Sequence, residues 1–190
     1  MPTIYLAGPE VFLPDARDVM SEKRRLARSF GFEPTGPGSD ENQAPVARLT
    51  ADAIYRRNED AMRRADVCLA NITPFRGISA DPGTVYEIGF MIALGKKVWA
   101  YTNHPDDYGS RVRSIWYGGL EIDESSGRPR GPDGMAIENH GKADNLMIDL
   151  GIEAIGGRVV RALALPADPA RELAIFAEAL RQLANKEGLQ

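Results

Sequence analysis

The sequence predicts an α/β domain in which helices cover both faces of a parallel sheet. Short apolar runs alternate with helix-length amphipathic segments along most of the 190 residues, which is typical of repeated strand–helix–strand units. The run Val67–Asn71 is apolar at nearly every position, as a strand buried on both faces requires. Neither a linker nor an internal repeat divides the chain, so we expect a single domain over residues 1–190.

The unit around this strand shows the clearest order of strand, loop and helix. The loop 72–80 carries proline, glycine and serine, which interrupt regular structure. Asp81 and Pro82 then begin a helix, with a side-chain acceptor at the N-cap and proline at the first helical position. Gly95 ends the helix, and Lys97–Tyr101 resumes as a strand. The apolar stripe of the helix consists of Val85, Ile88, Met91 and Ile92.

Two carboxylates, Asp81 and Glu87, lie in or just beyond this loop. The loop after a strand's carboxyl end borders the crevice in which open α/β sheets bind ligands. Asp81 is expected to cap the helix, and Glu87 lies more than one turn inside it, beside the apolar stripe. A glutamate beside buried side chains must be solvated by partners, titrated or used in chemistry. The alternative is that Asp81 is only a cap and Glu87 an exposed helix residue.

The remaining elements extend the same alternation in chain order. The first strand stops at Gly8, and Gly31 follows the end of the first helix. The last helix opens with Asp168 and Pro169, again in the capping order. The predicted elements are strands at Thr3–Ala7, Phe32–Pro34 and Val159–Leu163, helices at Asp15–Phe30, Thr50–Arg64, Asn145–Ile152 and Asp168–Gly188, and a loop at 35–47.

The segment 102–143 departs from the alternation because glycine and proline recur throughout it. A segment of this length inside a compact domain is either functional or contains elements that the pattern does not reveal. A disordered insertion is the alternative interpretation.

Composition excludes several classes of function. Hydrophobic residues make up 43% of the chain, which is enough for one buried core, and the net charge is −4. The basic runs Lys23–Arg25 and Arg63–Arg64 are short and lie on predicted helices, so we expect solvent-exposed faces and no nucleic-acid polymer as partner. A single cysteine, Cys68, excludes an intrachain disulfide, and with His104 and His140 it offers no zinc-ligand spacing.

The sequence lacks a basic stretch at its N-terminus and any apolar run long enough to cross a bilayer. We therefore expect a soluble cytoplasmic protein with no membrane partner. A GxGxxG motif, a P-loop and a GxSxG elbow are also absent from the sequence. The chemistry that remains is that of carboxylates acting on a small molecule, which suits glycosyl transfer.

Four motifs in the same order resemble those of the nucleoside 2-deoxyribosyltransferases. Each motif alone is weak, but together they span most of residues 1–155. They are Ile4–Phe12, Ala70–Gly77, Asp81–Gly89 and Asp144–Ile148.

The resemblance implies a flavodoxin-like sheet and exchange of the base of a 2′-deoxyribonucleoside with a free nucleobase, without a cofactor or metal. Glu87 matches the nucleophile that forms a covalent deoxyribosyl intermediate, and Tyr5 the tyrosine that positions it. Asp81 matches the residue that holds the deoxyribose hydroxyl. A carboxylate in the second helical turn, near the positive end of the helix, suits attack on carbon if it is ionised and poorly hydrated.

The resemblance also implies substrate contacts beyond these three residues. Asn145 matches an asparagine that a neighbouring subunit lends to the sugar 5′-hydroxyl, and Met147 a methionine packed at the site, so a homo-oligomer with shared sites is expected. Phe12 is expected to line the base pocket. The glycines Gly8 and Gly83 of the first and third motifs are expected to contact substrate.

One departure from the family's pattern concerns protonation of the base. Many members have an aspartate in the helix before the central strand, where this chain has Asn58, with Asp60 two residues on. Asparagine cannot supply a proton, although it can bind a base. We also expect the segment 102–143 to cover the site, because water would turn transfer into hydrolysis.

Two other functions fit the same residues. An N-glycosidase acting on deoxynucleoside 5′-monophosphates needs phosphate donors near Gly8 or Gly77, and Arg76 is the candidate. A nucleotide-sensing module without turnover has no use for a nucleophile at Glu87 beside Tyr5.

Overall fold

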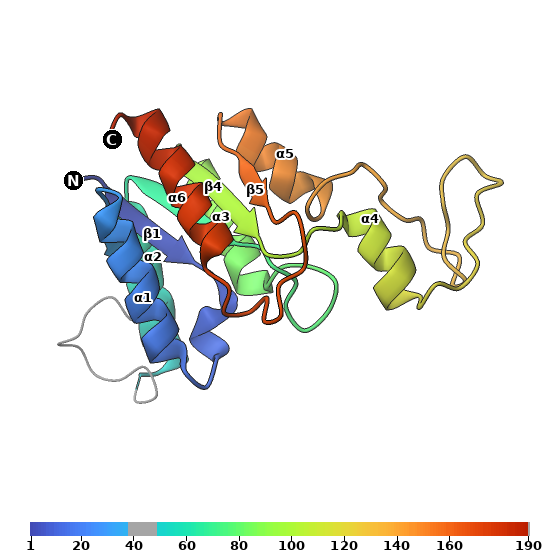
Figure 1. Ribbon diagram of the computed structural model, residues 1–190, viewed down its shortest axis with the longest axis horizontal. Coiled ribbons are helices and arrows are strands. Elements are labelled where there is room, and N and C mark those ends of the chain that lie inside the picture. Colours follow the sequence, from blue (N-terminus) through green and yellow to red (C-terminus); the bar gives the residue numbers. More distant parts are fainter. Residues whose placement is uncertain (38–48, 190) are drawn as a thin grey trace.

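The computed structural model describes residues 1–37 and 49–189, so most of the predicted loop 35–47 lies outside it. Its five-stranded parallel sheet has the order β2-β1-β3-β4-β5 (Figure 1). This order is that of a flavodoxin-like fold, as expected. The strands are β1 (Thr3–Ala7), β2 (Glu33–Thr35), β3 (Val67–Asn71), β4 (Lys97–Thr102) and β5 (Val159–Arg161).

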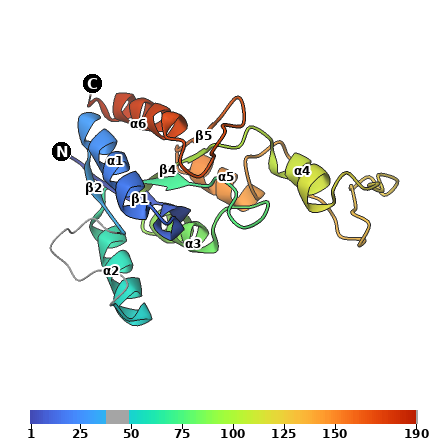
Figure 2. The same ribbon diagram turned by 60° about the horizontal axis from the view of Figure 1, so that its bottom comes forward.

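Helices cover both faces of the sheet. Figure 2 shows α6 on one side of the strands and α2 and α3 on the other. One core lies under α1 and α6, and a second core lies under α2, α3 and α5. The helices are α1 (Ala16–Ser29), α2 (Ala51–Arg64), α3 (Pro82–Ala93), α5 (Leu146–Ala154) and α6 (Ala174–Glu187).

The alternation of side chains along β1 decides which residues face α3. Ile4 and Leu6 belong to the core under α1 and α6, whereas Tyr5 and Ala7 belong to the opposite core. The register pairs Tyr5 with Cys68 of β3, and both lie on the α3 side of the sheet. Tyr5 is therefore directed at the helix that carries Glu87.

Side-chain caps begin two of the helices where the sequence predicts them. The Thr50 hydroxyl accepts a hydrogen bond from the Ala53 amide (3.2 Å) at the start of α2, and Asp81 caps α3. None of the helices in the described ranges has the length and apolar character needed to span a membrane.

The prediction that the last helix opens at Asp168 is wrong. The Asp168 side chain accepts the Ala170 amide (3.1 Å) and the Arg171 guanidinium (2.8 Å), and a short turn follows in place of a helix. The Asn103 side-chain amide donates to the backbone carbonyls of Pro169 and Glu172 (both 2.8 Å). These two carbonyls are thus satisfied by a residue distant in the sequence rather than by helical amides, and α6 starts at Ala174.

The predicted strand over Val159–Leu163 is too long by two residues. β4 ends at Thr102, which pairs with Arg161, so no strand lies beside the chain beyond that point. Leu163 is accordingly 99% exposed.

The segment 102–143 contains elements that its glycines and prolines conceal. The helix α4 (Tyr108–Arg111) continues directly into the π-helical turn η3 (Val112–Trp116). Beyond it, isolated antiparallel bridges join Asp123 to Arg130 and Arg130 to Ala136. In Figures 1 and 2 this segment projects away from the sheet and does not fold back over it, contrary to the expected cover.

A buried ion pair lies beside the carboxyl ends of the central strands β3 and β4. Lys23, expected on a solvent-exposed face, is completely buried, and its ammonium lies 2.5 Å from Glu10 Oε1. Asn71 Nδ2 (3.0 Å) and the Tyr101 hydroxyl (2.9 Å) donate to the same oxygen. Burial raises the pKa of Glu10, but the Lys23 charge and these hydrogen bonds bring it below its usual value. The pair holds the short helix η1 (Pro9–Phe12) against β3 and β4.

Replacing Lys23 by methionine should lower the free energy of unfolding by about 3–5 kcal/mol, because the Glu10 carboxylate would remain buried without its counter-charge. Urea denaturation at neutral pH measures the loss. Lys97→Met is the matched control, since the exposed Lys97 pairs with Glu187 (2.6 Å), and it should cost at most about 1 kcal/mol. Equal losses in the two variants would contradict the assignment.

Candidate active site

The structure brings Tyr5 and Glu87 together, as the sequence predicts. The Tyr5 hydroxyl donates a hydrogen bond of 2.5 Å to Glu87 Oε1. Tyr5 is completely buried in β1, whereas Glu87, in the second turn of α3, is partly exposed. The carboxylate is therefore fixed by one short hydrogen bond and still open to a ligand.

The surroundings of Glu87 disfavour its charge. Burial raises its pKa to about 7, the Asp81 charge adds to this effect, and the Tyr5 hydrogen bond opposes it. Burial and the Glu87 charge raise the pKa of Tyr5 far above its usual value, so Tyr5 remains a hydrogen-bond donor at all physiological pH values. A poorly solvated carboxylate of this kind is suited to nucleophilic or acid–base chemistry.

Asp81 is the buried N-cap of α3, and two glycines make room beside the site. Asp81 Oδ2 accepts hydrogen bonds from the Thr84 amide (2.9 Å) and hydroxyl (3.1 Å). A side chain at Gly83 would place its Cβ 3.0 Å from that oxygen. At Gly8 a Cβ would lie 2.1 Å from Glu10 Oε2, so only glycine fits there. Both glycines thus have a packing role, and their expected contact with substrate remains a prediction.

Phe12 belongs to an exposed aromatic group that the sequence analysis found only in part. Phe12 is 55% exposed and stacks on Phe75, with ring centroids 5.2 Å apart. The Arg76 guanidinium lies 5.3 Å from the Phe12 ring and 4.7 Å from that of Phe75. Arg76 also has a left-handed backbone (φ 52°), which is rare outside glycine. Phe75 was not named as a candidate site residue from the sequence. Its position beside an arginine, in the loop after a buried strand, could have indicated it.

The other expected substrate residues do not join this group within one chain. Asn145 caps α5, accepts from the Met147 amide (3.0 Å) and donates to the Glu138 carboxylate (3.0 and 3.1 Å). The Met147 side chain is 73% exposed. Asn58 is half-buried on α2, and across residues 1–37 and 49–189 no hydrogen bond links it to Glu87. Those same residues contain no group of three or more His, Cys, Asp or Glu side chains that could hold a metal ion.

Comparison with known proteins decides the family. The family model described as nucleoside 2-deoxyribosyltransferase matches residues 4–147, which include Tyr5, Asp81 and Glu87. The chain belongs to the nucleoside 2-deoxyribosyltransferase family. An uncharacterized protein of Schizosaccharomyces pombe is 31% identical over 171 residues, covering 84% of this chain and 81% of that protein.

Solved structures agree with this family assignment. The structure described as 2-desoxiribosyltransferase from Leishmania mexicana has a TM-score of 0.60 and 30% identity, and the match covers 78% of this chain and 85% of that one. A conserved protein from Enterococcus faecalis, at 18% identity and a TM-score of 0.55, shares the fold over 96% of this transferase-family chain and 99% of its own. At this identity the likeness to the Enterococcus faecalis protein concerns the fold alone, and it covers nearly the whole chain.

The Glu87→Gln variant should be more stable than the wild type at pH 8, by about 2 kcal/mol. The pKa of Glu87 is about 7 in the folded protein and near 4.5 when unfolded, so the native state loses stability as pH rises from 4.5 to 7. Glutamine removes this cost and can still accept the Tyr5 hydrogen bond. Thermal unfolding at pH 8 and at pH 4.5 tests the expectation.

The gain should nearly vanish at pH 4.5, where the wild-type carboxyl is protonated in the folded state and about half protonated in the unfolded state. Glu121→Gln, at an exposed glutamate, is the matched control and should change stability little at either pH. A Glu87→Gln variant less stable than the wild type at pH 8 would show that the ionised carboxylate is well solvated.

Proposed function

We propose that this protein transfers a 2-deoxyribosyl group between nucleobases by double displacement through Glu87. The observation that carries the proposal is the partly exposed carboxylate held by the buried Tyr5 hydroxyl at 2.5 Å. Membership of the family and the likeness to the Leishmania mexicana protein support this substrate class.

In the first step a Glu87 oxygen attacks C1′ of a 2′-deoxyribonucleoside. A bond forms between that oxygen and C1′ while the C1′–N bond breaks, and its electron pair leaves with the base, which takes up a proton. In the second step a nitrogen of the incoming base attacks C1′ from the opposite side, loses its proton, and releases the Glu87 carboxylate.

Tyr5 holds one oxygen of the nucleophile and leaves the other to react. Its hydrogen bond lowers the pKa of Glu87, which favours the ionised form needed for attack, and it stabilises the carboxylate again when the ester breaks. Asp81, more than one turn before Glu87, is the proposed partner of the deoxyribose hydroxyl. The exposed ring of Phe12 offers the base a surface on which to stack.

We also propose that the site is completed by a second subunit. Within one chain, none of the hydrogen bonds described above joins Asn145 or Met147 to Tyr5 or Glu87, and the Met147 side chain is largely exposed. The helices α3 and α5 pack against each other on one face of the sheet and leave several large apolar side chains in solvent. These are Tyr86, Leu94, Met147 and Leu150. Exposed apolar side chains of this kind support the proposal of an interface between subunits.

Incubation with deoxyinosine and free adenine should yield deoxyadenosine, detected by chromatography. Glu87→Ala should abolish the product, because no other group would bind C1′, whereas Glu121→Ala should retain activity. The kcat/KM for deoxyinosine should fall about tenfold per pH unit below 7, since only ionised Glu87 attacks.

Release of hypoxanthine and deoxyribose without a new nucleoside would indicate a hydrolase instead. If deoxynucleoside 5′-monophosphates were hydrolysed and nucleosides were not, the N-glycosidase alternative would hold. Absence of turnover with every base and monophosphate would leave the sensing module.

Mixing two inactive variants tests the shared site. Glu87→Gln and Asn145→Ala should each be nearly inactive alone, and subunit exchange between them should restore up to about a quarter of wild-type sites in a dimer, since one site then receives both intact residues. The mass of the wild-type particle, measured by light scattering, should exceed that of one chain. A monomer, or a mixture without recovered activity, would refute shared sites.

A further inference from the structure

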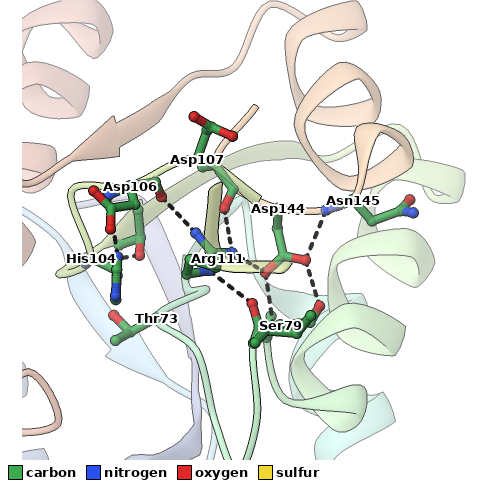
Figure 3. Close-up of polar contacts among 12 residues, drawn as sticks. Thr73, Ser79, His104, Asp106, Asp107, Arg111, Asp144 and Asn145 are labelled. Atoms are coloured by element: carbon green, nitrogen blue, oxygen red, sulfur yellow. Dashed lines mark hydrogen bonds and ion pairs between the residues drawn. The ribbon is translucent and has the colours of Figure 1, made fainter. Parts of the chain in front are cut away.

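One buried carboxylate joins the two loops that precede α3 and α5. Asp144 Oδ2 accepts the Ala80 amide (2.9 Å), and Oδ1 accepts the Ser79 hydroxyl (2.5 Å) and the Asn145 amide (2.8 Å) (Figure 3). Asp144 is 1% exposed. Ala80 immediately precedes Asp81, the N-cap of α3, and Asn145 is itself the N-cap of α5.

A buried arginine holds this carboxylate in place. Arg111 Nη2 lies 3.4 Å from Asp144 Oδ2 and donates to the Ala143 carbonyl (2.8 Å). Its Nε donates to the Ile78 carbonyl (2.8 Å) and its Nη1 to the Asp106 carbonyl (2.7 Å). Arg111 therefore joins three segments that are distant in the sequence. Because it is completely buried and bonded to the framework, it is not available to a ligand.

The Asp144 carboxylate contacts the backbone at or next to two residues that are proposed to bind substrate. Figure 3 shows Ser79 and Arg111 directed at the Asp144 carboxylate, while the Asn145 side chain points away from it. At Asn145 the Asp144 carboxylate binds the backbone amide and not the side chain, which instead donates to the Glu138 carboxylate. On the other side, the Ala80 bond fixes the peptide that leads into Asp81.

We propose that Asp144, held by Arg111, is a positioning residue that sets Asp81 in the site of its own chain and Asn145 for the site of the neighbouring subunit, and thereby governs binding of the nucleoside donor. The inference rests on the proposed function, in which those two residues hold the sugar hydroxyls. It gives the segment 102–143 a role, because this segment contributes Arg111 and leads into Asp144.

The two half-reactions of a double displacement separate this role from general stability. The donor's sugar contacts are gained between free enzyme and the first transition state, so they contribute to kcat/KM for the donor. In the second half-reaction the sugar is already attached to Glu87, and its contacts are present before and after the base binds. The kcat/KM for the base is therefore nearly insensitive to them. A loss of folded protein instead lowers both parameters by the same factor.

The experiment compares Asp144→Asn with Asp149→Asn in both half-reactions. Asparagine at 144 must turn an NH₂ group either toward the Ala80 amide and Arg111 or toward Ser79 and the Asn145 amide, so donors face each other in either orientation. We expect kcat/KM for the donor to fall at least about tenfold and kcat/KM for the base to change less than about twofold.

Asp149 provides the matched control because it is also buried and, from within α5, binds the backbone of the same loop. It accepts the amides of Ala143 (2.8 Å) and Asp144 (3.0 Å) and makes no bond to Ser79 or Ala80. Asp149→Asn should alter the two parameters by equal factors. A second pair of variants, less disruptive than the first, tests the same role if Asp144→Asn fails to fold. Ser79→Ala should reduce only the donor parameter, and Ser110→Ala, which removes a bond to Asp107 (2.8 Å), should reduce neither selectively.

Amide hydrogen exchange gives a readout that does not depend on turnover. Asp144→Asn should accelerate exchange at Ala80 and Asn145 together, and Asp149→Asn should leave Ala80 unchanged. A wild type that exchanges no base would refute the proposed function, and the amide data would still decide whether Asp144 couples the two loops. Equal losses in both kinetic parameters, or unchanged exchange at Ala80 and Asn145, would overturn the positioning role.

Discussion

The site depends on the register of β1 against β3. Both strands are buried on both faces, so alternate side chains must satisfy two different cores. A shift of one residue would send Tyr5 toward α1 and α6 and leave Glu87 without its hydrogen-bond donor. Packing of the apolar residues Ile4 and Leu6 on the other face therefore fixes the tyrosine that the chemistry needs.

Three carboxylates at the carboxyl edge of the sheet have different numbers of charged and hydrogen-bonding partners. Glu10 has the Lys23 ammonium and two neutral donors, and Asp144 has Arg111 and three further donors. Within residues 1–37 and 49–189 the Glu87 carboxylate accepts a hydrogen bond only from the Tyr5 hydroxyl, and burial leaves its pKa raised to about 7. The two compensated carboxylates stabilise the framework, and the poorly compensated one is the reactive candidate. The protein therefore loses folding stability by keeping a poorly solvated carboxylate at the position of the proposed nucleophile.

The projecting segment 102–143 links the fold to the site through a few buried contacts. Its α4 contributes Arg111, and its end contributes Asp144, while the rest extends beyond the body of the sheet in Figure 1. The loops at the starts of α3 and α5 are thus positioned by a part of the chain that lacks a core of its own. The exposed Met147 lies next to this junction, on the helix that we propose reaches a second subunit.

The sequence by itself determined the parallel sheet, the start of α2 and the Asp81 cap of α3, because these follow from local periodicity and capping chemistry, and the resemblance of its short motifs to a known family implied the Tyr5–Glu87 pair. It did not reveal that Lys23 is buried, that α4 and η3 lie within a glycine-rich segment, or that the turn at Asp168 is not helical. Each of these depends on a partner distant in the chain, such as Glu10 for Lys23 or Asn103 for the Pro169 carbonyl. Only the tertiary structure brings such partners together, since a buried charge or carbonyl is satisfied by whichever group the packing places beside it.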